Sequence, residues 1–123
     1  MNDARSALEV ALTGLEEAKA RIAVLMGQRD RDVRLDVVQA RRALAEQITL
    51  VGAAGERLFA NSELAAFRSK WAAMRSTTAL HQARWPAVSL GERPEEFRAS
   101  TEPMRVAGAE FVEWTRAALR RLP

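Results

Sequence analysis

The sequence is poor in the residues on which much protein chemistry depends: its 123 residues include no cysteine and a single histidine. Without cysteine the chain cannot form disulfides, use a thiolate nucleophile or bind metal through thiolates. No Glu-x-x-His motif of the kind found in di-iron helical bundles occurs, and no glycine-rich phosphate loop is present. We therefore expect no metal and no cofactor, and we assign no catalytic residues.

Long hydrophobic runs are also missing. No stretch approaches the roughly 18 consecutive apolar residues of a membrane-spanning helix. The first five residues carry an acid and do not lead into an apolar segment typical of a signal peptide. The sequence therefore predicts a cytoplasmic protein with no membrane partner.

The sequence also has little excess of charge of either sign, and its formal net charge is only +3. The longest stretch without an acid, 64–91, contains four cations. Long cationic side chains commonly cover the edges of an apolar stripe while their charges stay in water. We therefore expect no nucleic-acid partner.

What the sequence does contain is helical periodicity, with 48% hydrophobic and 28% charged residues. Apolar residues recur three and four positions apart in four segments, and no segment has the alternation of a strand. The pattern predicts an all-α single domain over 1–123, folded as an antiparallel four-helix bundle. The expected helices span 3–26, 33–59, 62–84 and 100–122.

Residues at the ends of these segments supply start and stop signals. Gly27 is suited to end the first helix, and either aspartate in the polar run 29–32 is suited to cap the second. Asn61 and Ser62 are the expected N-cap of the third helix, which Pro86 ends. Gly52 and Gly55 interrupt the second helix, and we interpret them as sites of close packing.

The third segment carries a stripe in which large apolar residues give way to polar ones. Its members alternate three and four positions apart, so they share one helix face. We expect this face, including the only histidine, to point toward the core. The stripe consists of Leu64, Phe67, Trp71, Met74, Thr78, His81 and Trp85.

The connection 85–99 is longer than most connections in helical bundles, which span about 2–8 residues. It is too apolar for a flexible linker, because it contains Trp85, Val88, Leu90 and Phe97. We expect an ordered lid across one end of the bundle. Pro94 and the two glutamates after it are suited to start a short helical turn within it.

A binding site for a small anionic ligand is one hypothesis for this end. Guanidinium groups bind carboxylates and phosphates through paired hydrogen bonds, and aromatic side chains would form the walls. The alternative is that the polar residues only satisfy one another at the end of the bundle. The candidate ligand-binding residues are Thr78, His81, Arg84, Trp85, Phe97, Arg98 and Trp114.

The six residues 81–86 resemble the H-box of sensor histidine kinases, with His81, Arg84 and Pro86 at the positions of the histidine, the basic residue and the proline. The resemblance implies phosphate transfer at His81. Gln82 departs from the acidic residue that usually follows the histidine, and the chain carries no nucleotide-binding domain.

Apolar residues outside the main stripe of the second helix favour a different class of function. Leu35, Val38, Leu50 and Phe59 exceed what one core-facing stripe requires. Such surplus on a long helix is common at interfaces. The leading prediction is a non-enzymatic interaction module, a homodimer or a subunit that docks on another protein.

Overall fold

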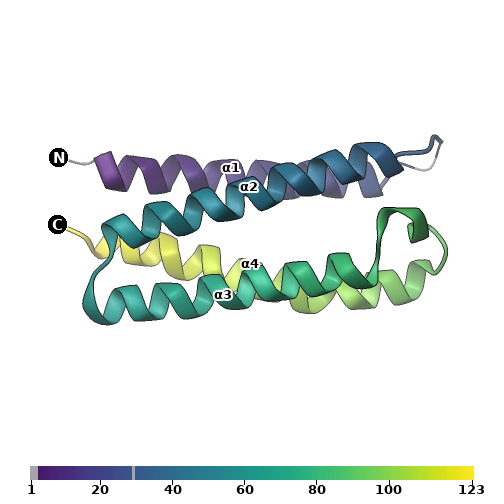
Figure 1. The fold of residues 1–123 in the computed structure, drawn as a ribbon. Coiled ribbons are helices and arrows are strands. Elements are labelled where there is room, and N and C mark those ends of the chain that lie inside the picture. The colour runs from purple at the N-terminus through teal and green to yellow at the C-terminus, as the bar shows by residue number, and fades with distance from the viewer. Residues whose placement is uncertain (1–2, 29) are drawn as a thin grey trace. The chain divides into compact units, whose positions relative to one another are not determined.

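The computed structural model describes residues 3–28 and 30–123, and this part of the chain contains helices and no strand. The all-α prediction is therefore confirmed (Figure 1). One short 3-10 helix, η1, precedes the last long helix. The elements are α1 (Asp3–Met26), α2 (Arg34–Leu58), α3 (Asn61–Arg84), η1 (Ala87–Ser89) and α4 (Pro94–Arg121).

The chain forms two compact units rather than one continuous cluster. The first ends at Leu58 and contains α1 and α2, and the second, Phe59–Pro123, contains α3 and α4. Within each unit the second helix folds back along the first as a helical hairpin (Figure 1).

Leucine and β-branched residues at helical spacing form the core of the first unit. The buried positions largely follow the expected three-and-four spacing, and near the end of α1 Leu25 is buried whereas Met26 is half-buried. The α2 helix continues through Gly52 and Gly55, both buried, so these glycines do not end it. The main buried side chains are Leu8, Leu12, Leu15, Leu25, Val37, Leu44, Ile48 and Val51.

The α3 helix begins differently from the expected cap. Its N-cap residue is Ala60, which makes no side-chain capping hydrogen bond. Asn61 adopts the left-handed region with φ 56° instead of capping. Asparagine tolerates this conformation better than most residues, and only Phe59 and Ala60 separate α3 from α2. The sharp turn thus uses the asparagine for its backbone rather than for its side chain.

Aromatic rings form much of the core in the second unit. Phe67 lies between Phe59 and Phe111, with ring centroids 5.3 and 5.4 Å away, and Trp114 lies 5.7 Å from Phe59. The prediction that Phe59 adds to an exposed face of the second helix is wrong. Phe59 follows the end of α2 and is 4% exposed, because its ring packs into this aromatic cluster.

The fourth helix starts six residues earlier than expected, at Pro94 instead of Ser100. Proline fits the first position of a helix because its missing N–H needs no partner there. Glu95 and Glu96 in the first turn suit the positive end of the helix dipole. The connection between α3 and α4 is accordingly 85–93, and it contains η1. Pro103, which falls in the first turn of the expected helix 100–122, lies inside α4.

Candidate functional site

The end of α3 places the only histidine inside the second unit. Thr78, His81 and Trp85 follow one another along the same face and are all buried, and His81 is 8% exposed. The inward orientation that the stripe predicts is therefore present in the structure.

His81 is held by the first part of α4. Its Nδ1 lies 3.2 Å from Ser100 Oγ, and the Ser100 hydroxyl donates to the Phe97 carbonyl at 2.9 Å. Because that hydroxyl hydrogen is used, His81 Nδ1–H is the donor to Ser100 Oγ. The Phe97 ring packs beside the imidazole with centroids 5.2 Å apart. These contacts fix the orientation of the imidazole.

Trp85 closes the same end of the unit. Its ring meets Phe97 edge to face at 5.3 Å, and the Arg93 guanidinium lies 5.1 Å from its ring centroid. The indole Nε1 is buried and has no hydrogen-bond partner among the described residues. A buried N–H without a partner is costly, so this atom is the part of the cluster that is suited to bind an acceptor.

The remaining candidate residues are not part of this cluster. Arg84 and Arg98 are exposed. Trp114 is 17 residues beyond Phe97 on α4, about 25 Å along the helix, and belongs to the aromatic cluster of Phe59 and Phe67. The structure therefore brings together Thr78, His81, Trp85 and Phe97, and it separates Trp114 from them.

Two residues of the cluster, Ser100 and Arg93, were missed by the sequence reasoning. Both depend on where α4 begins. Ser100 lies one turn after Phe97 once the helix starts at Pro94, and Arg93 is its N-cap. The signal for both is Pro94 followed by two glutamates, which we interpreted as a short turn within the lid and which is the start of the fourth helix.

The cluster has the chemistry of a packed structural element. Phosphate transfer requires an accessible imidazole, whereas that of His81 is buried and its Nδ1 is hydrogen-bonded. In the described residues no three His, Asp or Glu side chains gather as potential metal ligands. No helix within 3–28 and 30–123 is long and apolar enough to cross a membrane.

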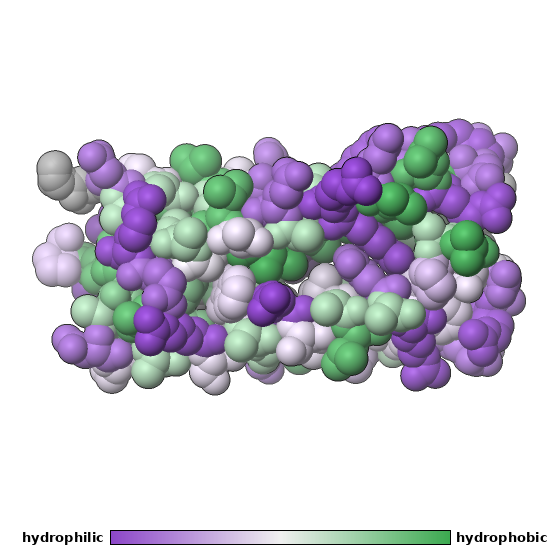
Figure 2. All heavy atoms as spheres, in the orientation of Figure 1, coloured by the Kyte–Doolittle hydropathy of each residue, from purple (hydrophilic) through white to green (hydrophobic). Residues whose placement is uncertain are grey.

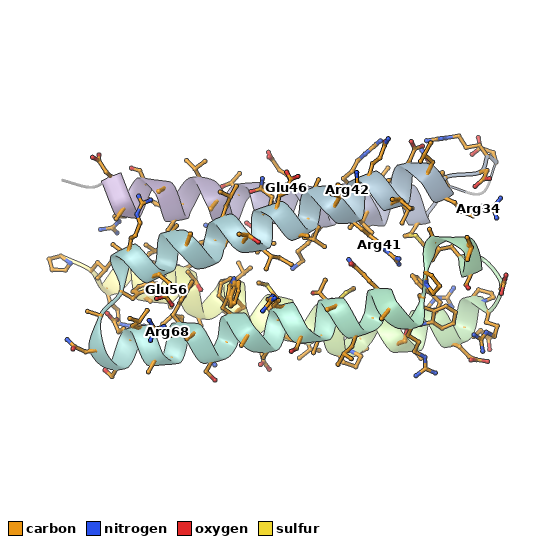
Figure 3. All side chains as sticks on the ribbon, viewed as in Figure 1. Arg34, Arg41, Arg42, Glu46, Glu56 and Arg68 are labelled. Carbon is orange, nitrogen blue, oxygen red and sulfur yellow. The ribbon has the colours of Figure 1, made fainter. Side chains whose placement is uncertain are left out.

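A second candidate site is the outer face of α2, opposite its buried stripe. Three large apolar residues are exposed there: Leu35 by 70%, Val38 by 39% and Leu50 by 53%. Arg42 and Glu46, one turn apart on α2, lie between them in the sequence (Figure 3). Figure 2 shows hydrophobic and hydrophilic residues interspersed on the side of the molecule that faces the viewer. Such a mixture of apolar and charged side chains is typical of the interfaces of proteins that also exist in solution without their partner.

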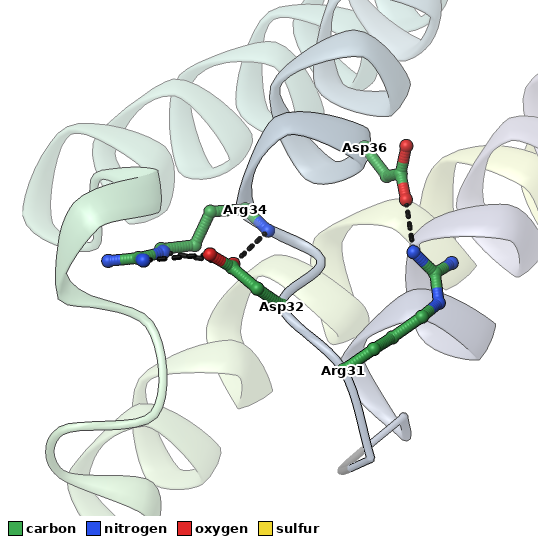
Figure 4. Close-up of polar contacts among 4 residues, drawn as sticks. All are labelled: Arg31, Asp32, Arg34 and Asp36. Carbon is green, nitrogen blue, oxygen red and sulfur yellow. Dashed lines mark hydrogen bonds and ion pairs between the residues drawn. The ribbon is translucent and has the colours of Figure 1, made fainter.

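The polar corner before α2 is organised by ion pairs (Figure 4). Asp32 accepts hydrogen bonds from the Arg34 backbone N–H at 3.0 Å and from its guanidinium at 2.7 Å, and Arg31 pairs with Asp36 at 2.8 Å. The side-chain hydrogen bond from Arg34 is the main cause that lowers the pKa of Asp32 to about 2. Val33 is the residue whose carbonyl accepts the first backbone hydrogen bond of α2, and Asp32 precedes it. The expected aspartate cap is therefore displaced by one residue, with the Asp32 carboxylate accepting from the first helical N–H. Arg29, part of the predicted corner, lies outside the described residues.

Comparison with protein-family models, curated proteins and solved structures finds no match to this chain. The residues and contacts of the chain itself are therefore the basis on which a function can be inferred.

Proposed function

We propose that the protein is a non-enzymatic interaction module that docks through the outer face of α2. This face comprises Leu35, Val38, Arg42, Glu46 and Leu50. The observation that carries the proposal is the exposure of three large apolar side chains on one face of one helix.

Physical chemistry favours burial of these side chains in a complex. Burying a large aliphatic side chain yields about 1.5–3 kcal/mol. A single exposed leucine is ordinary on a protein surface. Three on one face, combined with charges that can pair across an interface, provide both an apolar contact and a means of selecting the partner.

The proposal retains three predictions of the sequence. The four helices are proposed to assemble as an antiparallel four-helix bundle, with the connection after Trp85 over one end as a lid. A cytoplasmic location also remains a prediction.

The test is to make the outer face of α2 polar without disturbing the core. The double variant Leu35→Gln/Leu50→Gln changes two exposed positions, so its free energy of unfolding should match the unchanged protein within about 0.5 kcal/mol. Leu80→Gln is the matched control, since Leu80 is 71% exposed on α3. Self-association is measured by sedimentation velocity, and other partners by quantitative affinity capture with each variant as bait.

We expect the unchanged protein to associate with itself or with another protein. This association should be lost in the double variant and kept in the Leu80→Gln control. The proposal is contradicted if the protein stays monomeric at about 1 mM and the three baits capture the same proteins.

A second candidate function is binding of a small anionic ligand beside Trp85. Two observations favour it: the unpartnered Trp85 Nε1–H, and the Arg93 guanidinium close to the same ring. Phosphate and small carboxylates should then raise the melting temperature, and Trp85→Phe, which keeps an aromatic side chain but removes the N–H donor, should abolish the shift. The absence of a shift across the panel would exclude this candidate.

A further inference from the structure

We infer that the partner on the outer face of α2 is a second copy of this chain, with the two α2 helices packed antiparallel about a two-fold axis at the level of Leu44. The inference rests on the proposed function and names the occupant of that face.

Four residues of this face of α2 are evenly spaced. Val38, Arg42, Glu46 and Leu50 are each four residues apart on α2, and all are exposed. Residues at this spacing form a continuous ridge that runs obliquely across a helix surface. Along the ridge the four side chains are, in order, apolar, positive, negative and apolar.

This order is complementary to itself when it is reversed. In an antiparallel pair, Arg42 faces the partner's Glu46, and Glu46 faces the partner's Arg42. The same alignment sets Val38 against the partner's Leu50. A parallel pair would instead place like charges opposite one another, which is unfavourable. Each two-fold contact occurs twice, as an isologous interface requires.

The surface beside the ridge is shallow. Ala45, Thr49 and Ala53 form the neighbouring row and are all exposed. The Thr49 hydroxyl donates to the Ala45 carbonyl at 3.1 Å, so it is satisfied within its own helix. These short side chains leave a groove in which the partner's ridge fits. Ridges of this kind that pack into such grooves give helices crossing at about −50°.

Leu35 lies farther from the crossing point than the ridge. Antiparallel pairing about Leu44 pairs its level with the partner's Ala53, but both lie about 13 Å from the crossing point along their helices, so Leu35 stays at the rim of this contact. One crossing pair of helices buries less than the roughly 1,200 Å² of a standard interface. We therefore expect a weak, reversible dimer that weakens further as salt is added, because exposed ion pairs are screened.

Charge reversal tests the register. Arg42→Glu and Glu46→Arg each turn two attractive contacts into repulsive ones and should weaken dimerisation about tenfold. The double variant Arg42→Glu/Glu46→Arg recreates both pairs and should return the dissociation constant to within about twofold of the original. Glu110→Arg, a matched charge change at an exposed position of α4, should have no effect. Sedimentation equilibrium measures all four variants, and circular dichroism checks that each is folded.

Mixing the two single variants provides an independent measurement. One then carries two acids on the ridge and the other two bases, so the mixture should associate more strongly than either variant alone. Failure of the double variant to recover, or single reversals without effect, would overturn the inference. A monomeric unchanged protein would also overturn it. Capture that is lost in Leu35→Gln/Leu50→Gln would leave the proposed function standing with a different partner.

Discussion

Gly14 shows how a single residue sets the contact between α1 and α2. A Cβ at this position would lie 2.9 Å from Gln47 Cδ and would also overlap the Gln47 Oε1 atom. The obstruction is the far end of a flexible side chain, not the backbone. The glycine therefore allows the Gln47 amide to lie over α1.

This contact predicts an energetic coupling between the two residues. In a Gln47→Ala background, Gly14→Ala should raise the free energy of unfolding by about 1 kcal/mol, the helix-propensity difference between the two residues. In the unchanged protein the gain should be smaller, because Gln47 must move. Urea unfolding of the four variants measures the coupling, and equal gains in both backgrounds would contradict the contact.

The Asp32 carboxyl predicts a pH dependence at the start of α2. Its pKa is lowered from 3.8 to about 2 by the hydrogen bonds from Arg34. A lowered pKa means that the fold favours the ionised form. This contribution to stability is complete above pH 3.8 and is lost as the pH falls toward 2.

An NMR titration of the Asp32 carboxyl measures this directly. The midpoint should lie near 2 in the unchanged protein and should rise toward the ordinary value of 3.8 in Arg34→Gln. A midpoint that Arg34→Gln leaves unchanged would disprove the pairing.

Residue patterns predicted the orientation of His81 but not its partner. The three-and-four spacing of the α3 stripe is a property of one helix, so it can be found without tertiary information. The contact with Ser100 depends on how α3 and α4 align, and the periodicity of one helix carries no information about that alignment. Phe59 was misplaced for a similar reason, since its pattern continued α2 while its ring packs with Phe67 and Trp114.

At the scale of elements, helix interiors were predicted well and two boundaries were not. The predicted start of α3 relied on Asn61 and Ser62 as its N-cap, and the fourth helix was expected to begin at Ser100. Each helix begins at a residue chosen for its backbone instead: a left-handed asparagine and a proline in the first turn. Capping preferences alone do not distinguish these solutions.

The position of Pro103 inside α4 yields a test of that boundary. An interior proline has no N–H to donate to the carbonyl four residues earlier, here that of Ala99. Both residues are exposed, so water can bond this carbonyl and reduce the cost. Pro103→Ala should therefore raise the free energy of unfolding by about 1–2 kcal/mol, part of the proline penalty in a helix interior. Thermal or urea unfolding provides the measurement.

Pro94→Ala is the matched control for this substitution. Proline is well suited to a first-turn position, so its replacement should give no gain in stability. If the helix began near Ser100 instead, Pro103 would occupy the first turn, and Pro103→Ala would bring no gain either. That result would contradict the boundary in the structure.

At the scale of the whole molecule, composition and periodicity were sufficient to predict an all-α chain with four long helices. They were not sufficient to predict the division into two compact units, which depends on the distribution of contacts along the folded chain. The proposed function also belongs to this scale, because it requires a second molecule that covers the outer face of α2.

The most direct test of the central claim is a cysteine cross-link across the proposed dimer. The chain has no cysteine of its own, so Arg42→Cys and Glu46→Cys each introduce one reactive group. Mild oxidation of an equimolar mixture should give clearly more mixed disulfide than the two homodisulfides combined, because position 42 faces position 46 of the partner. A mixture of Arg42→Cys with Glu110→Cys should give only the statistical proportion, in which the mixed disulfide equals the two homodisulfides combined. Cross-linking in the proportions of random collision for both mixtures would contradict the account.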